Sequence, residues 1–124
     1  MNPAELFSHE ENPVLLSAGE VLFKEGESGD AMFVLLDGSL DVVVSGRVVG
    51  VSSRGDILGE MALIDQSPRS ATVIAREPAR LVKLDSIRFH RLIQQHPFFA
   101  THVMKVLADR IRRMDQLLAR PGNG

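Results

Sequence analysis

The 124-residue chain contains no cysteine, no tryptophan and no tyrosine. The absence of cysteine excludes a disulfide framework and thiol chemistry. The absence of tryptophan and tyrosine argues against an aromatic cage and against a platform on which single-stranded nucleic acid could stack. No apolar run approaches the roughly 18 residues that a membrane-spanning helix requires, and the N-terminus lacks the basic start and apolar segment of a secretory signal. We therefore expect a cytoplasmic protein with no membrane contact.

Charge and length narrow the possibilities further. The formal net charge of −2 gives no general attraction to nucleic acid or to an anionic membrane. The length is close to the commonest domain size and is enough for an ordinary hydrophobic core. We expect a single domain over residues 1–124, with strands over about 14–85 and C-terminal helices over about 86–119.

Short apolar segments separated by glycine-containing turns predict a series of strands. The expected strands cover Val14–Ser17, Glu20–Lys24, Ala31–Asp37, Ser39–Ser45, Arg47–Ser52, Asp56–Leu58, Arg69–Ala75 and Arg80–Leu84. Many short strands at this spacing indicate a β-sandwich or a jelly-roll barrel. A weak helix is expected in the first dozen residues. After the strands, Asp85 or Ser86 can cap a helix that runs to about Gln95, and Pro97 is placed to begin another.

The segment from Gly55 to Val73 carries the most informative pattern in the chain. Gly59 lets the backbone approach a ligand closely. Residues 60–63 predict one helical turn whose unpaired N–H groups could face an anion. Arg69 follows Pro68 and begins an expected strand, which would hold its guanidinium in a fixed direction. A planar guanidinium aimed at a helix N-terminus predicts a site for phosphate.

This order of residues resembles the phosphate-binding cassette of cyclic-nucleotide-binding domains. The matching positions are Gly59, Glu60, Ala62, Leu63, Pro68, Arg69, Ser70 and Ala71, while Leu58 stands where the family usually has phenylalanine. A second match covers residues 26–35 and Gly38. The resemblance implies a mainly β fold with added helices: an eight-stranded antiparallel jelly-roll barrel, a short cassette helix and two C-terminal helices. It also implies a non-catalytic receptor for a 3′,5′-cyclic nucleotide that needs no cofactor and no metal.

The resemblance assigns roles to the matching residues. Arg69 would pair with the cyclic phosphate and Glu60 with the ribose 2′-hydroxyl. Backbone N–H groups would face the phosphate and ribose from Gly59, Met61, Ala62 and Leu63, with Ser70 and Ala71 beside them. Serine at position 70 favours cyclic AMP slightly over cyclic GMP. Arg110 is the candidate to cover the base, with Arg113 beside it. Without the resemblance, Arg69 would be interpreted as a surface ion pair with Glu60 or Asp65.

The last expected helix carries an apolar seam with gaps of three and four residues, formed by Met104, Leu107, Ile111, Met114 and Leu118. The seam could pack on the barrel or meet a second copy of the chain. Family resemblance favours a homodimer through this helix, or a helix that closes over bound nucleotide. The histidines, His9, His90, His96 and His102, all lie outside the expected strands, so no metal cluster is expected inside a barrel.

Three functions stay open. The first is a receptor whose C-terminal helices move when nucleotide binds and act on an effector domain or partner. The second is a nucleotide-independent dimerisation or docking module, against which the presence of both Glu60 and Arg69 argues. The third is a phosphodiesterase, which would need a metal site or a base that the sequence does not offer. No DNA-reading element is expected, because the tail from Arg120 is too short for a helix-turn-helix.

Overall fold

The computed structural model describes residues 2–118 and divides into two compact units, one ending at Phe89 and the other beginning at His90. The first unit contains a short 3-10 helix, η1 (Pro3–Phe7), and eight strands. The strands are β1 (Val14–Leu16), β2 (Val21–Phe23), β3 (Ala31–Asp37), β4 (Leu40–Val44), β5 (Arg47–Ser52), β6 (Ile57–Leu58), β7 (Thr72–Ala75) and β8 (Ala79–Asp85). One helical turn, α1 (Met61–Ile64), lies between β6 and β7.

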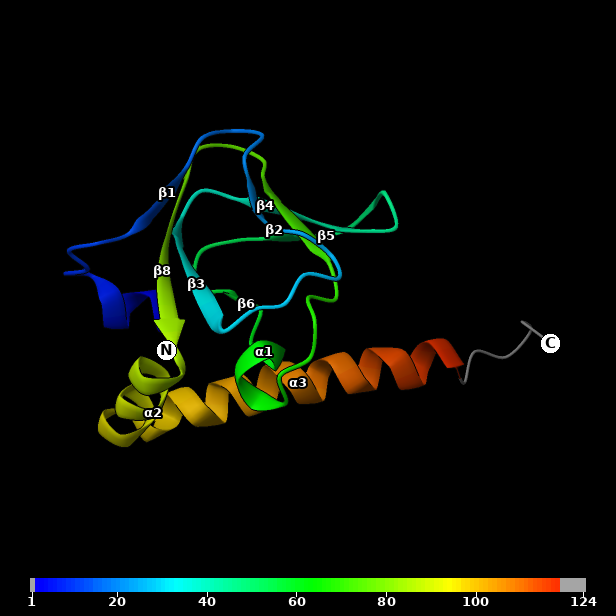
Figure 1. Ribbon diagram of the computed structural model, residues 1–124. Coiled ribbons are helices and arrows are strands. Elements are labelled where there is room, and N and C mark those ends of the chain that lie inside the picture. Colours follow the sequence, from blue (N-terminus) through cyan, green and yellow to red (C-terminus); the bar gives the residue numbers. More distant parts are fainter. Residues whose placement is uncertain (1, 119–124) are drawn as a thin grey trace. The chain divides into compact units, whose positions relative to one another are not determined.

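The strands form two four-stranded sheets, in the orders β1-β8-β3-β6 and β2-β7-β4-β5 (Figure 1). Every paired neighbour is antiparallel. The predicted mainly β fold with eight antiparallel strands is therefore confirmed. The two sheets do not close into a barrel, because each edge strand is hydrogen-bonded to one neighbour only.

The hydrophobic core of the first unit draws on both sheets. One sheet supplies Leu16, Phe33, Leu35, Leu58, Ala79 and Leu81, and the other supplies Leu40, Val73 and Ala75. Residues 31–36 of β3 are all buried, as expected for a central strand covered on both faces. Leu58, which replaces the usual phenylalanine of the family pattern, is part of this cluster.

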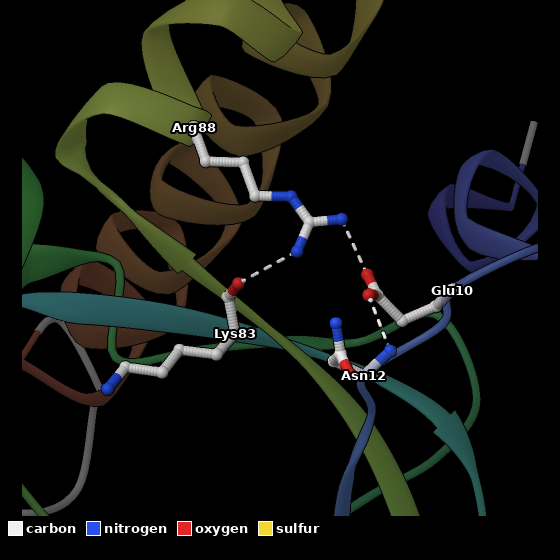
Figure 2. A network of polar contacts seen from close by, with 4 residues as sticks. All are labelled: Glu10, Asn12, Lys83 and Arg88. Carbon is white, nitrogen blue, oxygen red and sulfur yellow. Dashed lines mark hydrogen bonds and ion pairs between the residues drawn. The ribbon is translucent and has the colours of Figure 1, made fainter.

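A polar network ties the N-terminal segment to β8 and to Arg88, just after that strand (Figure 2). The Arg88 guanidinium donates to Glu10 Oε2 at 2.5 Å and to the Lys83 carbonyl at 3.3 Å. Glu10 Oε1 accepts from the Asn12 N–H at 3.2 Å. The Arg88 Cζ also lies 5.8 Å from the centre of the Phe7 ring. Residues 7–12 are thus held to a part of the chain that is distant in sequence.

The predicted C-terminal helices are both present. The first, α2 (Ser86–Gln95), spans the boundary between the units, and α3 (Pro97–Leu118) lies in the second unit. Asp85 Oδ1 accepts from the Arg88 N–H at 2.8 Å, which is the expected N-terminal cap. No helix within residues 2–118 is long and apolar enough to cross a membrane.

The apolar seam of α3 is largely exposed. The side chains of Met104, Ile111 and Met114 are about 60% exposed (61%, 60% and 62%). Leu107 is half-buried, and the side chain of Leu118 lies outside the described residues. Within residues 97–116 of this helix, the buried side chains are instead those of Phe99 and Val103. The interpretation of the seam as a core face is therefore wrong for its three exposed members, because the helix buries a different stripe.

Candidate functional site

Arg69 lies in the loop before β7 and not on a strand, so the predicted strand over Arg69–Ala75 begins three residues too early. Although Arg69 is not part of a strand, two backbone hydrogen bonds fix its position. The Arg69 N–H donates to the Glu27 carbonyl at 2.8 Å, and the Gly26 N–H donates to the Arg69 carbonyl at 2.8 Å. The Glu25 N–H adds a bond to Thr72 Oγ1 at 2.9 Å. The loop at residues 25–27 therefore extends the β2–β7 pairing as far as Arg69 and fixes its direction.

The Arg69 side chain is buried, with 8% of the residue exposed. Its Nη1 donates to the Gly59 carbonyl at 3.0 Å, and its Nη2 donates to the Ala31 carbonyl at 2.8 Å. Neither bond goes to a carboxylate. The Nε atom is buried and has no hydrogen-bond partner among residues 2–118. A guanidinium carries five N–H donors, so the backbone carbonyls leave donor capacity inside a site with little access to water.

Aromatic rings and glycines form the walls around the guanidinium. The Arg69 Cζ lies 4.3 Å from the centre of the Phe23 ring and 5.9 Å from that of Phe33. A Cβ placed on Gly29 or on Gly59 would collide with the guanidinium. A side chain at either position would therefore force the guanidinium to move.

The electrostatics of the site leave the Arg69 cation under-compensated. Burial lowers the pKa of the Arg69 guanidinium below its ordinary value, and the carboxylates of Asp30, Glu27 and Glu60, in that order, oppose the shift without cancelling it. The charge is thus less stable here than in water, because the solvent that it loses is only partly replaced. An anion placed against the guanidinium would supply the missing compensation.

The turn that carries Gly59 and Glu60 follows β6. Gly59 has a φ of +75°, which disfavours any residue with a Cβ. Glu60 is 1% exposed and precedes α1, and its side chain does not cap that helix. The N–H groups of Ala62 and Leu63 donate within the turn, to the carbonyls of Gly59 at 3.2 Å and Glu60 at 3.0 Å. These two amides, predicted to face a ligand, are therefore also engaged in the helical turn itself.

The structure brings some of the predicted site residues together. Gly59 and Arg69 are in direct contact, and the Glu60 carboxylate lies near enough to act on the Arg69 charge. Ala62 and Ala71 are buried, Met61 and Leu63 are half-buried, and Ser70 is exposed beside Arg69. Arg110 is exposed on α3, in the second unit. The ligand-binding roles of these residues stay predictions.

Sequence reasoning missed four residues that surround the guanidinium: Phe23, Gly29, Ala31 and Phe33. The motif around Gly29 and Ala31 was visible as a match to the family pattern, but nothing local connects it to Arg69. The contact exists because the loops after β2 and before β7 are hydrogen-bonded to each other.

The groups around Arg69 are of the kind that recognise an anion. Among the residues that the structure describes, no group of three or more His, Asp or Glu side chains is placed to hold a metal ion. The chemistry available is a buried cation, an adjacent buried carboxylate and backbone polar groups. Such a set recognises a ligand that combines a phosphate with hydroxyl donors.

Comparison with protein families gives one match that covers most of the chain. The model of the Cyclic nucleotide-binding domain matches residues 13–96. Among curated proteins, a lysophospholipase nte1 of Aspergillus oryzae is 34% identical over 109 residues, which are 84% of this chain. That of Pyricularia oryzae is also 34% identical, over 104 residues. The chain spans only 7% of the length of either relative.

Solved structures show the same similarity. The Thermus thermophilus catabolite activator protein superposes with a TM-score of 0.79 at 26% identity, covering 91% of this chain and 61% of that one. The cAMP-bound PfPKA-R superposes with a TM-score of 0.69 at 31% identity, covering 90% of this chain and 37% of that one.

Proposed function

Because the chain belongs to the cyclic nucleotide-binding domain family, we propose that it binds a 3′,5′-cyclic nucleotide at the segment from Gly59 to Ala71 and does not convert it. One observation carries this proposal. The Arg69 guanidinium is buried, its Nε has no acceptor among residues 2–118, and its charge is incompletely compensated. A cyclic phosphate carries one negative charge and two exocyclic oxygens, which match the edge of a guanidinium.

Groups near Arg69 suit the ribose and the base of a cyclic nucleotide. The Glu60 carboxylate accepts hydrogen bonds only, so it suits the ribose 2′-hydroxyl. We propose that backbone N–H groups of Gly59, Met61, Ala62 and Leu63 face the phosphate and ribose, with Ser70 and Ala71 beside them. We propose cyclic AMP as the preferred ligand over cyclic GMP, on the serine at position 70. Arg110 is the proposed cover for the base, since a guanidinium can stack on a purine.

We propose that the domain is regulatory. Nucleotide binding at Arg69 would favour one arrangement of α2 and α3 over another, and the helices would pass that change to an effector domain or partner protein. The curated relatives are lysophospholipases of which the chain matches a small part. By analogy, catalysis would belong to such an effector. The proposed location is the cytoplasm, without direct contact with DNA or a membrane.

A dimer through α3 is a second proposal, favoured by the exposure of Met104, Ile111 and Met114 at helical spacing. It also underlies the rival function, a docking module that does not bind nucleotide. Sedimentation with and without cyclic nucleotide tests the dimer. A monomer at micromolar concentration in both conditions would contradict it.

Calorimetric titration with cyclic AMP and cyclic GMP tests the main proposal, with 5′-AMP as the control that lacks a cyclic phosphodiester. Ligand at 100 times its dissociation constant should raise the free energy of unfolding by about 2.7 kcal/mol, and recovery of unchanged nucleotide should show the absence of hydrolysis. No heat of binding and no thermal shift with either cyclic nucleotide would refute the proposal and favour the docking module.

A further inference from the structure

We propose that Phe23 is a positioning residue for Arg69, and that the face of its ring sets the affinity of the site for the cyclic phosphate. The inference rests on the proposed function and adds a determinant outside the phosphate-binding segment. Phe23 is the last residue of β2, and Phe23 pairs with Val73 in β7. The sheet pairing therefore places the ring at the point where the chain returns from Arg69 into β7.

The geometry favours a specific interaction over general packing. The Arg69 Cζ is 4.3 Å from the centre of the Phe23 ring, well inside the roughly 6 Å limit for a cation–π contact. Phe33 lies near that limit, at 5.9 Å. The two ring centres are 6.1 Å apart, so the guanidinium has one close ring and one distant ring. Phe23 is the stronger partner of the two.

A ring beneath the guanidinium leaves its edge available. The Gly59 and Ala31 carbonyls already accept from Nη1 and Nη2. Together with the ring they fix both the plane of the guanidinium and its rotation within that plane. A phosphate binds the edge of such a group and not its face. The ring contact can therefore persist in the complex, and it orients the cation before the ligand arrives.

The rival explanation is that Phe23 only fills space. It packs against the core cluster, as does its neighbour Leu22. Leucine at position 23 would keep most of that packing but would remove the electron-rich face. Tyrosine or tryptophan would keep the face. These substitutions separate the two explanations, and Leu22→Val serves as the matched control for a packing change on the same strand.

The first measurement is the dissociation constant of cyclic AMP by calorimetry. We expect Phe23→Leu to weaken binding by about fivefold, which corresponds to about 1 kcal/mol. Phe23→Tyr should stay within about twofold of wild type, and Leu22→Val should leave affinity unchanged. Equal affinities for Phe23→Leu and wild type, or an equally weak Phe23→Tyr, would overturn the proposal.

The second measurement needs no ligand. A double-mutant cycle of urea unfolding compares Phe23→Leu in the wild-type background and in the Arg69→Met background. Phe23→Leu should lower the folding equilibrium constant by about fivefold more in the wild-type background. Independent, additive effects would overturn the ring–guanidinium contact. If wild type bound no cyclic nucleotide, the proposed function and the claim about affinity would both fail. Coupling measured in the free protein would then show separately whether Phe23 holds Arg69.

A spectroscopic signature completes the test. The chain has no tryptophan and no tyrosine, so Phe23→Trp introduces a single indole next to the guanidinium. Its emission should change when cyclic AMP binds and should not respond to 5′-AMP. Unchanged emission at a saturating cyclic AMP concentration that calorimetry confirms would contradict a ring in contact with the ligand-binding cation.

Discussion

Adding one methyl group at Gly29 should disable the site without unfolding the protein. Gly29 has no positive φ, so alanine introduces no backbone strain there. Its Cβ would collide with the Nε, Cζ and Nη2 atoms of Arg69. The guanidinium is the end of a flexible side chain, so it is the group that moves.

The size of the effect follows from the distances. Non-bonded carbon atoms settle about 3.5–4.0 Å apart, so the guanidinium must move by about 1 Å. Its bonds to the Gly59 and Ala31 carbonyls are 3.0 and 2.8 Å long, and after such a shift at least one exceeds the length of about 3.2 Å at which these bonds are normally seen. Misplacing a desolvated cation from its phosphate should cost about 2–5 kcal/mol, or about 30- to 3,000-fold in affinity.

Gly50→Ala is the matched control. Gly50 also lacks a positive φ, and a Cβ there would meet nothing within 4 Å. We expect wild-type affinity and a free energy of unfolding raised by about 0.4–1 kcal/mol. Calorimetric titration of cyclic AMP and urea unfolding of both variants test the pair. Wild-type affinity in Gly29→Ala would refute the placement of Arg69 described above.

Three further predictions concern other groups. Arg69→Ala should weaken cyclic AMP binding by about 30- to 3,000-fold, whereas Arg47→Ala on β5 should not; equal titrations of the two variants would contradict the assignment. A 2′-deoxy cyclic nucleotide should bind wild type about 10- to 100-fold more weakly than its parent, and that ratio should approach one in Glu60→Ala. Burial works to raise the pKa of Glu10, but hydrogen bonds from Arg88 and from the backbone of Asn12 lower it overall. Since the folded-state pKa is depressed, the carboxylate stabilises the fold above its ordinary pKa of 4.5 and loses that contribution as the pH falls through the folded value. Acid unfolding of Glu10→Gln should therefore be less steep than that of wild type, and Arg88→Gln should lose at most about 1 kcal/mol of stability near pH 7.

Local patterns were sufficient for most of the secondary structure. Short apolar segments bounded by glycine turns predict β3 and β5 with the observed ends, and the capping residue Asp85 and Pro97 predict where α2 and α3 begin. These signals are local because turn dihedrals and helix caps depend on a few neighbouring residues. The cassette motif likewise identified Gly59 and Arg69, and the structure places them in direct contact.

Tertiary structure decided what surrounds Arg69 and which stripe of α3 is buried. The hydrogen bonding that extends from the start of β7 back to Arg69 is made by the backbone of Gly26 and Glu27. The residues next to Arg69 in the sequence carry no signal of that pairing. The same hydrogen bonds between loops that are remote in sequence bring the Phe23 ring, and the space left by the missing side chain of Gly29, next to the guanidinium. The spacing of apolar residues in α3 predicts a seam along the helix but does not show which surface packs against it. Periodicity alone therefore could not show that Phe99 and Val103 are buried while Met104, Ile111 and Met114 stay exposed, because that choice depends on what packs against the helix.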